Sequence, residues 1–245
     1  QNFAPEVRAA IDATPTSFAR LAQQMRWTDV EFISDLPGKN DNRLRLGGGG
    51  RTSLALARLV QGAKQRVVIQ SPYLVASDEA LALLGEVRAR GVGVRISTNS
   101  LASTDNLPAF SGYRNQRDDL LAMGLQIFEY KPAPAVQQQL VLRLAAATRS
   151  APVFALHAKT LVIDGKTLYI GTYNFDPRSQ NLNTEVGVVI HDEALAREVE
   201  AAIEKGLKWV AKSQSSLGHW TAGGYPTAMT ALAGTALVAS GSTTI

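Results

Sequence analysis

The chain has 245 residues, of which 45% are hydrophobic and 19% charged, a balance typical of a folded globular protein rather than a disordered one. Its 25 Lys and Arg residues outnumber its 21 Asp and Glu residues, and the net charge of +4 mildly favours anionic partners such as phosphates or acidic lipid surfaces. The sequence contains no cysteine, which excludes disulfides and thiolate metal sites. Because no apolar run approaches the roughly 18 residues of a membrane-spanning helix, we expect any membrane contact to be peripheral.

The N-terminal quarter predicts short elements joined by loops. Apolar residues at helical spacing indicate one surface helix within residues 1–26, and a brief strand is expected at Val30–Ile33. The turn formers of residues 35–42 predict a loop. The run Gly47–Gly50 is typical of a flexible connector before a helix at Thr52–Lys64, since no P-loop Lys-Ser/Thr pair follows it. Three basic residues are expected on a solvated loop face, with a lipid-headgroup patch as the alternative: Lys39, Arg43 and Arg45.

From residue 66 onward, predicted strands and helices alternate. Strands are expected at residues 67–74, 92–98, 125–130, 156–163, 167–170 and 185–191. Helices are expected at residues 78–90, 114–123 and 192–205, and a loop or lid at 131–139. Asp164-Gly165 predicts a hairpin, while Asp192 and Gly206 are expected to mark the start and the end of the last helix. The order predicts an α/β fold, with a sheet covered by helices.

Two pairs of polar residues are expected to converge near the predicted hairpin. Because alternate residues of a strand share a face, His157 and Lys159 point the same way, and so do Thr172 and Asn174. Such a face offers an imidazole able to act as nucleophile or acid, an ammonium to neutralise phosphate oxygens, and hydroxyl and amide donors. Gly171 is expected to leave room for a phosphate to approach the backbone.

The spacing H-x-K-x4-D-x6-G-[ST]-x-N, from His157 to Asn174, resembles the HKD signature of the phospholipase D superfamily. Further stretches are similar to the C-terminal half of bacterial cardiolipin-synthase-type members: Ile69–Tyr73, Asn99–Leu101, Ser103–Asp105, Gly112-Tyr113 and Asn174–Ser179. The resemblance covers about residues 27–205. It implies a mixed sheet flanked by helices that forms one half of a pseudo-twofold pair, and chemistry through a phosphohistidine that uses no metal and no cofactor.

The resemblance also implies roles for single residues. His157 would attack phosphorus or protonate the leaving alcohol, while Lys159 and Asn174 would hold phosphate oxygens, with Gly171 and Thr172 beside them. Glu185 lies where the family has an acid that orients the imidazole, which fits the chemistry because a carboxylate fixes the ring tautomer. Asp164 is expected to have a structural role in its turn, with direct catalysis as the alternative. The remaining histidines lack a following x-Lys and are expected to be structural or on the surface: His191 and His219.

The motif occurs once, whereas the resemblance implies two copies per active site. Either an upstream half belongs to the same product, which the similarity to C-terminal halves and the start at Gln1 favour, or two chains pair. In the first case His157 would be the acid and base. We divide the chain into an N-terminal helical segment (1–26), a phospholipase D-like catalytic half-domain (27–211) and a Ser/Thr/Gly/Ala-rich tail (212–245).

These inferences predict an enzyme that cleaves or transfers phosphodiesters of membrane phospholipids, as a cardiolipin synthase does, bound peripherally to a bacterial membrane. The first alternative is a homodimeric nuclease, against which the modest charge and the lack of aromatic-basic interleaving argue. The second is a half-domain that serves interaction without catalysis. The sequence leaves open the acceptor alcohol and the balance of transfer and hydrolysis.

Overall fold

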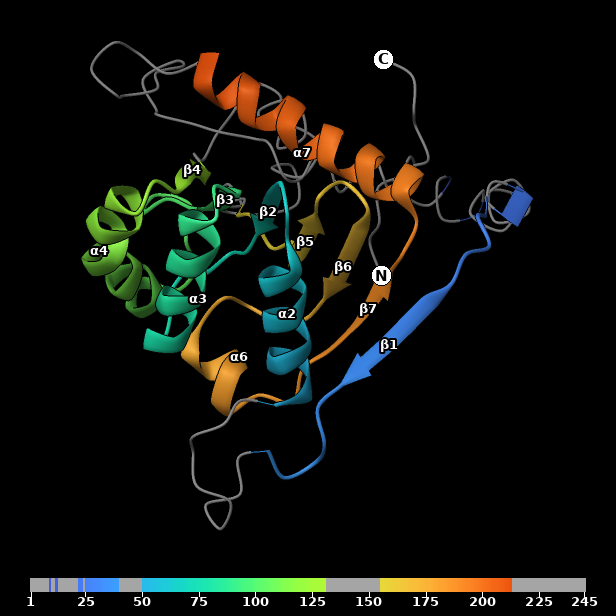
Figure 1. Cartoon of the computed structure of the whole chain (residues 1–245), viewed down its shortest axis with the longest axis horizontal. Coiled ribbons are helices and arrows are strands. Elements are labelled where there is room, and N and C mark those ends of the chain that lie inside the picture. The colour runs from blue at the N-terminus through green and yellow to red at the C-terminus, as the bar shows by residue number, and fades with distance from the viewer. Residues whose placement is uncertain are drawn as a thin grey trace.

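The computed structural model describes residues 25–39, 50–130 and 155–212, with side chains as far as residue 206, and the isolated residues 9, 12, 22 and 23. Within these ranges the strands form one seven-stranded sheet in the order β1-β7-β6-β5-β2-β3-β4. β2, β3 and β4 run parallel to one another, and the other neighbours are antiparallel. Figure 1 shows helices packed around this sheet. The predicted mixed sheet flanked by helices is confirmed.

The elements occur in the predicted order, but β2 ends at Gln70 rather than at 74 and β5 begins at Thr160 rather than at 156, so His157 and Lys159 precede the strand in which they were predicted. The strands are β1 (Val30–Ser34), β2 (Arg66–Gln70), β3 (Gly93–Asn99), β4 (Gln126–Tyr130), β5 (Thr160–Ile163), β6 (Thr167–Gly171) and β7 (Val186–Ile190). The helices are α2 (Arg51–Gly62), α3 (Asp78–Ala89), α4 (Leu107–Ala122), α6 (Pro177–Asn181) and α7 (Glu193–Lys212). The regions predicted as an N-terminal helix, a loop or lid at 131–139 and a tail lie largely outside the described residues.

Side-chain alternation along the strands builds two cores. In β2, Val67 and Ile69 face the core formed with α2, α3 and α4, whereas Val68 faces the core formed with α7. Figure 1 shows α2, α3 and α4 next to one another, with α7 crossing at the upper edge of the view. The central strands are therefore buried on both faces, and the polar residues at their ends, such as Gln70, Asn99 and Thr160, are buried as well.

Two predicted helix boundaries were wrong, and one short helix was missed. α4 begins at Leu107 rather than at 114, because the Asn106 side chain accepts a hydrogen bond from the Ala109 amide and Pro108 suits the first helical turn. The short α6 was not predicted, although Asp176 caps it in the same way. α7 continues to Lys212, so Gly206 lies inside the helix, where one glycine costs only about 1 kcal/mol.

The sheet has two edges of different character. At the site edge, as we call it, β1, β2, β3 and β6 end and β5 and β7 begin, since Ser34 pairs with Val186, and Thr160 pairs with both Gln70 and Ile170. At the opposite edge, which we call the turn edge, the predicted hairpin is confirmed. Asp164 and Gly165, with positive φ angles of 55° and 66°, are the central residues of a turn in which the Lys166 amide donates to the Ile163 carbonyl at 2.9 Å.

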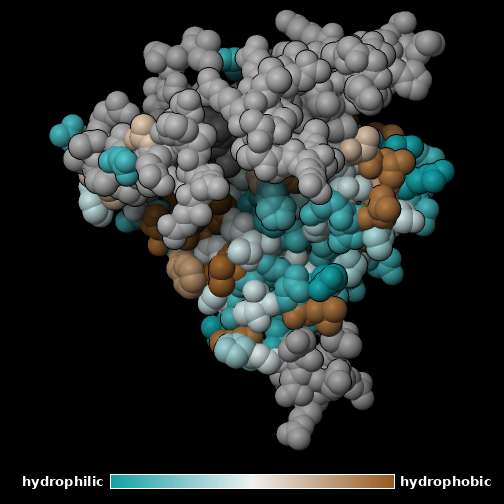
Figure 2. All heavy atoms as spheres, turned by 180° about the vertical axis from the view of Figure 1, so that it is seen from behind, coloured by the Kyte–Doolittle hydropathy of each residue, from teal (hydrophilic) through white to brown (hydrophobic). Residues whose placement is uncertain are grey.

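The surface carries no large continuous apolar face in the view from behind. There the described residues are mostly hydrophilic, and hydrophobic side chains lie in separate groups (Figure 2). Among the described helices, none combines the length and apolarity that a membrane crossing requires.

Candidate functional site

His157 and Lys159 lie at the site edge, in the segment that leads into β5. The buried Asn99, at the end of β3, fixes this segment: its Oδ1 accepts from the Leu156 amide at 2.8 Å and its Nδ2 donates to the Leu156 carbonyl at 3.0 Å. The same Nδ2 donates to the Pro72 carbonyl at 3.2 Å. One buried amide therefore ties the residue before His157 to the ends of two parallel strands.

Lys159 is half-buried beside an exposed His157. Its Nζ donates to the His157 carbonyl at 3.0 Å, so the backbone of one predicted site residue positions the side chain of the other. Burial lowers the pKa of Lys159, and the negative charges of Glu185, Asp105 and Asp176 partly oppose this effect. A partly desolvated ammonium interacts more strongly with an anion than a solvated one, because water screens it less.

Thr172 and Glu185 form a hydrogen-bonded pair across β6 and β7. The Thr172 hydroxyl donates to Glu185 Oε2, and Asn183 Nδ2 donates to Glu185 Oε1 at 3.1 Å. The Glu185 carboxylate is buried, and among the described residues these two side chains are its partners. A contact between Glu185 and the His157 ring therefore stays a prediction.

Asn174 carries a buried acceptor without a partner. Its backbone amide donates to Ser179 Oγ at 3.0 Å, which fixes the start of the loop before α6. Its side-chain Oδ1 is buried and accepts no hydrogen bond from the described residues. Leaving such a group unpaired costs about 1–3 kcal/mol, so an unpaired amide at a polar site is expected to gain its partner from a ligand or another chain.

A buried ion pair between Asp35 and Lys39, which the sequence did not indicate, lies next to Glu185 at the site edge. Lys39 Nζ lies 2.7 Å from Asp35 Oδ2, and both side chains are almost fully buried. Asp35 also accepts from the backbone amides of Thr52 at 2.9 Å and Glu185 at 3.0 Å. Burial alone would raise the pKa of Asp35, but the hydrogen bonds from Lys39, Thr52 and Glu185 outweigh it and lower the pKa.

This ion pair corrects two expectations. Lys39 is not on a solvated loop face, since its ammonium also donates to the Ser179 carbonyl at 2.6 Å; Arg43 and Arg45 lie outside the described residues. Gly50 is more than a connector, because a Cβ there would collide with the Asp35 carboxylate. Asp35 and Lys39 thus join the backbone of Glu185 to the turn that holds Asn174.

A second set of contacts that the sequence did not indicate involves the stretch Ile69–Tyr73. The Tyr73 hydroxyl donates to Asp105 Oδ1 at 2.8 Å, and burial, with this carboxylate, raises the pKa of Tyr73 to about 12. Ser71 Oγ accepts from the Phe175 amide at 2.9 Å, which ties the loop after β2 to the segment before α6. Sequence similarity marked both stretches, but only the fold shows that they touch.

Asp164 lies at the turn edge, at the other end of β5 from His157. Seven residues of extended chain separate them by roughly 20 Å. The Asp164 carboxylate accepts from the backbone amides of Lys64, Gln65 and Arg66 at 2.8–2.9 Å. Burial would raise the pKa of Asp164, but these hydrogen bonds lower it. Its contacts favour the structural role over direct catalysis.

Close packing leaves no space for a side chain at Gly171. A Cβ at this position would collide with the Tyr169 hydroxyl and the Val186 carbonyl, and a Cβ at Gly187 would collide with the Tyr169 ring. The two facing glycines of β6 and β7 therefore make room for a buried tyrosine, and the approach of a phosphate to Gly171 stays a prediction. Tyr169 in turn forms part of the wall of a cavity.

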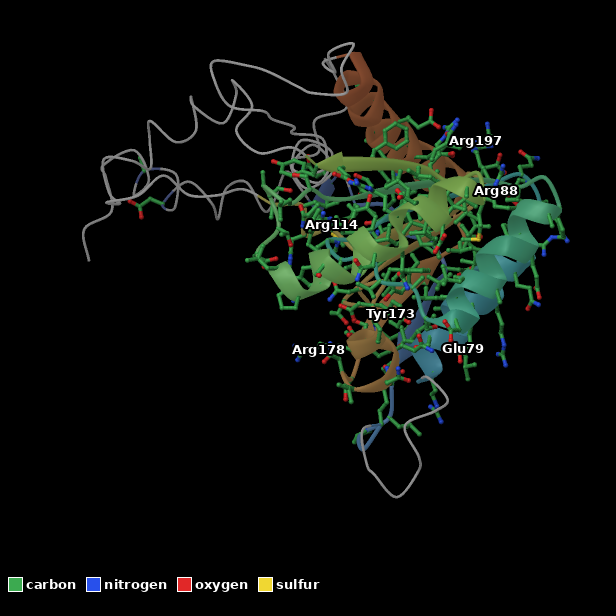
Figure 3. All side chains as sticks on the ribbon, turned by 90° about the vertical axis from the view of Figure 1, so that its left-hand side faces the viewer. Glu79, Arg88, Arg114, Tyr173, Arg178 and Arg197 are labelled. Atoms are coloured by element: carbon green, nitrogen blue, oxygen red, sulfur yellow. The ribbon has the colours of Figure 1, made fainter. Side chains whose placement is uncertain are left out.

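This cavity, of about 380 Å³, lies between α2, α3 and the sheet. Lys159 belongs to its wall, as do Tyr173 and Phe175 from the segment after β6. Figure 3 labels Tyr173 near the lower end of the molecule, where α6 lies, with Glu79 of α3 and Arg178 nearby. The cavity and the candidate site therefore share one residue, Lys159.

Two further features of the described residues concern possible metal ligands and the other histidines. No group of three His, Asp or Glu side chains within the described ranges is placed to hold a metal ion. His191 lies at the turn edge, where its Nδ1 is 3.3 Å from Thr167 Oγ1, consistent with the surface role expected of it. His219 lies outside the described residues.

Comparisons with known proteins agree with this architecture. A family model described as "Cardiolipin synthase, PLD-like domain" matches residues 56–207, more than half of the chain. Cardiolipin synthase C of Escherichia coli (strain K12) is 38% identical over 177 residues, which cover 71% of this chain and 36% of that protein. Cardiolipin synthase A of Pseudomonas aeruginosa is 31% identical over 152 residues, covering 62% and 26%.

Among solved structures, NucT from Helicobacter pylori has a similar fold. The TM-score is 0.51 at 17% identity, and the similarity covers 74% of this chain and 96% of NucT. At this identity the likeness concerns the fold alone. The present chain spans a quarter to about a third of the length of the two synthases described above.

Proposed function

Because the chain belongs to the cardiolipin synthase, PLD-like domain family, we propose that it supplies one half of an active site that cleaves or transfers phosphodiesters of membrane phospholipids. One observation carries the proposal: the site edge brings the Lys159 ammonium, the Thr172 hydroxyl and the side-chain amide of Asn174 to the same end of the sheet as the exposed His157. An ammonium and amide donors are suited to a phosphate anion, and an accessible imidazole is suited to attack or to proton transfer.

In the proposed first step, a histidine nitrogen attacks the phosphorus of the lipid. A nitrogen–phosphorus bond forms, the bond between phosphorus and the alcohol oxygen breaks, and the electron pair leaves with that oxygen. The other histidine donates its proton to the leaving alcohol. Lys159 and the amide of Asn174 stabilise the negative charge on the oxygens of phosphorus, which grows in the transition state.

In the second step the same groups act in reverse. The histidine that lost its proton takes one from an acceptor alcohol or from water, whose oxygen then attacks phosphorus as the nitrogen–phosphorus bond breaks. An alcohol as acceptor gives transfer, and water gives hydrolysis. His157 takes the acid and base role if an upstream half supplies the nucleophile.

The second histidine has two proposed sources. The share of its relatives that the chain covers supports a longer product with an upstream half that carries its own motif. Two copies of the chain that pair across a twofold axis are the alternative. The unpaired acceptor of Asn174 at the site edge supports either arrangement, since a facing half can supply a donor.

Four exposed leucines near the site edge support contact with lipid or with a second half. Leu101 and Leu107 follow the end of β3, Leu54 lies in the first turn of α2, and Leu182 follows α6. Their exposed fractions range from 44% to 61%. Apolar side chains exposed beside a phosphate site are suited to an amphipathic partner such as a phospholipid. We therefore propose peripheral association with a bacterial membrane.

The test follows the covalent intermediate. The assembled enzyme, made from the full gene product, is mixed with phosphatidylglycerol labelled with ³²P, quenched in alkali and analysed for labelled protein and for lipid products. We expect acid-labile label on histidine, and cardiolipin or phosphatidic acid as product. His157→Ala should lower turnover by about 10²–10⁴-fold without changing thermal unfolding.

His191→Ala is the matched control, because it removes a histidine at the turn edge and should keep wild-type turnover. Turnover of the lipid by His157→Ala at the wild-type rate would refute the assignment. Cleavage of DNA by the pure 245-residue chain, rising with its dimer fraction and without lipid turnover, would replace the proposal with the nuclease alternative.

A further inference from the structure

We propose that the cavity between α2, α3 and the sheet binds one fatty-acyl chain of the lipid whose phosphate is held at Lys159. The inference rests on the proposed function, because it assigns the apolar part of the same substrate. It adds a binding site at residues outside the motif, on two helices that carry none of the proposed catalytic groups. Three observations lead to it.

The first observation is the composition of the cavity wall. α2 contributes Ala57 and Val60, and α3 contributes Ala80, Leu83 and Leu84. The sheet and the segment after β6 close the other side with Ile69, Leu161, Tyr169, Tyr173 and Phe175. Polar side chains also line the cavity, among them Ser53, Ser77, Glu79, Gln180 and Asn181, but most of its wall residues are aliphatic or aromatic, which favours a hydrocarbon chain over a sugar or a base.

The second observation is that the cavity is continuous with the phosphate site. Lys159 belongs to the cavity wall, and so do its polar neighbours Thr160, Gln70 and Ser71. A phospholipid has the same order, with an anionic phosphate, then a polar glycerol ester, then an apolar chain. A phosphate held at Lys159 thus has its glycerol beside polar wall residues and its chain facing the aliphatic ones.

The third observation is the size and accessibility of the cavity. Its volume of about 380 Å³ falls within the range of about 300–1,000 Å³ of ligand pockets. Its wall runs from buried Val60 and Leu84 to exposed Leu54 and Glu79, so it reaches the surface at the ends of α2 and α3 nearest the site edge. A chain can therefore enter from outside while its phosphate stays at the surface.

Photolabelling tests the site without relying on turnover. The 245-residue chain is irradiated with phosphatidylglycerol that carries a diazirine in one acyl chain, in vesicles of unlabelled phosphatidylglycerol, and labelled peptides are mapped by mass spectrometry. We expect label on wall residues of α2 and α3. Label confined to exposed leucines such as Leu101 and Leu107 would overturn the inference, since it would show surface contact alone.

Variants that fill the cavity sharpen the test. Ala57→Phe and Ala80→Phe place a ring in the space proposed for the chain, and each should lower labelling of α2 and α3 by about tenfold or more. Ala82→Phe is the matched control, because it makes the same change on the exposed side of α3 and should leave labelling unchanged. Thermal unfolding shows whether each variant is folded, and the mapping of label on the wild-type chain stands whatever the variants do.

A second arm separates this inference from the proposed function. The assembled enzyme is assayed on phosphatidylglycerol and on bis(p-nitrophenyl) phosphate, a diester without acyl chains. Ala57→Phe should lower the ratio of lipid to chain-free turnover by about tenfold. An unchanged ratio, with lipid turnover intact, refutes the acyl-chain site alone. No turnover of either diester by the wild-type enzyme, with label still in the cavity, refutes the proposed function and leaves the binding site standing.

Discussion

The two ends of strand β5 carry residues of one sequence motif in opposite states. At the site edge, His157 is exposed, Lys159 is partly desolvated, and the nearby Asn174 has a buried oxygen without a partner. At the turn edge, the carboxylate of Asp164 is satisfied by three backbone amides. The motif therefore combines groups that await a ligand with one that holds the strand in register.

This difference shows that residues of one sequence motif can have different roles. Residues at the site edge have unmet interactions that stability alone does not explain, whereas the contacts of Asp164 are complete within the chain. Substitutions at the two ends should therefore change different measured quantities. Substitutions of His157 and Lys159 should change rate, and substitutions of Asp164 should change the free energy of unfolding.

The largest effect after loss of His157 is expected for Lys159→Ala. It removes the cation nearest the proposed phosphate, and loss of one such electrostatic contact typically lowers kcat by about 10²–10³-fold. The fold should persist, because the one hydrogen bond from Lys159 Nζ goes to the nearby His157 carbonyl. Turnover and urea unfolding are measured on the same preparation, and a variant with normal turnover would contradict the assignment.

The pH profile sharpens this prediction. Because the pKa of Lys159 is lowered, the ammonium should lose its proton, and turnover should decline, as pH rises through a value below 10.5. Lys159→Arg keeps the charge at all these pH values, so it should remove that decline while lowering the maximum rate. An alkaline limb of identical position in both proteins would assign the limb to another group.

Asp35→Asn should have the largest effect on stability. It leaves the buried Lys39 ammonium without its counter-ion, and breaking a buried pair in this way costs about 3–5 kcal/mol. Urea unfolding measures the loss. The double variant with Lys39→Met removes the unpaired charge and should recover part of it, whereas equal losses in the single and double variants would contradict the ion pair.

Acidification provides a second test of Asp35. A carboxylate whose pKa is lowered in the folded state stabilises it fully above the unfolded value of about 3.9, and this contribution disappears as pH falls through the lower folded pKa. The stability difference between the wild-type chain and Asp35→Asn should therefore shrink below pH ~4. A constant difference down to pH ~2 would show that the charge is not responsible.

Asp164→Ala should cost about 1–3 kcal/mol of stability, because three amides lose their acceptor. Asp164→Asn should cost less, since asparagine tolerates the positive φ of 55° and keeps one acceptor oxygen. Turnover per folded molecule of the assembled enzyme should stay near that of the wild type for both. A fall of 10²-fold or more in folded Asp164→Asn would restore the catalytic alternative.

The smallest effect is expected from chelators. The proposed chemistry passes through histidine, so EDTA should leave turnover of phosphatidylglycerol by the assembled enzyme unchanged, and Lys159 is the cation it relies on. The assay uses vesicles whose aggregation is followed by light scattering, because divalent ions also act on lipid. Inactivation by EDTA that added Mg²⁺ or Zn²⁺ reverses would overturn the histidine mechanism.

The sequence predicted the parts of this molecule that depend on local patterns. Strands β2 and β3 were predicted near their observed positions and Asp164-Gly165 located the hairpin, because both signals lie within a few residues. The beginning of α4 was missed because the residues around Asn106 and Pro108 show no clear helical spacing of apolar side chains. Local patterns are also what made the motif visible, since its residues fall within 18 positions from 157 to 174.

The sequence did not predict contacts between distant segments. Asp35 appeared to be a turn former and Lys39 a solvated charge, yet they pair with each other and bind backbone groups of Glu185 and Ser179. Gly171 also makes room for the buried Tyr169, a contact that the sequence did not indicate. No local rule predicts such contacts, because they arise only when β1 pairs with β7 and β6 lies beside them.

The contact between Asp35 and Glu185 has a consequence for how the protein is made. The two residues are 150 positions apart, and a ribosome adds about 5–20 residues per second, so roughly 8 to 30 seconds pass between their synthesis. During this interval β1 has no β7 to pair with, and Asp35 lacks the Glu185 amide that it binds in the folded chain. The parallel strands β2, β3 and β4 are complete much earlier. The pairing of β1 with β7 is therefore the last part of the sheet to assemble on the growing chain.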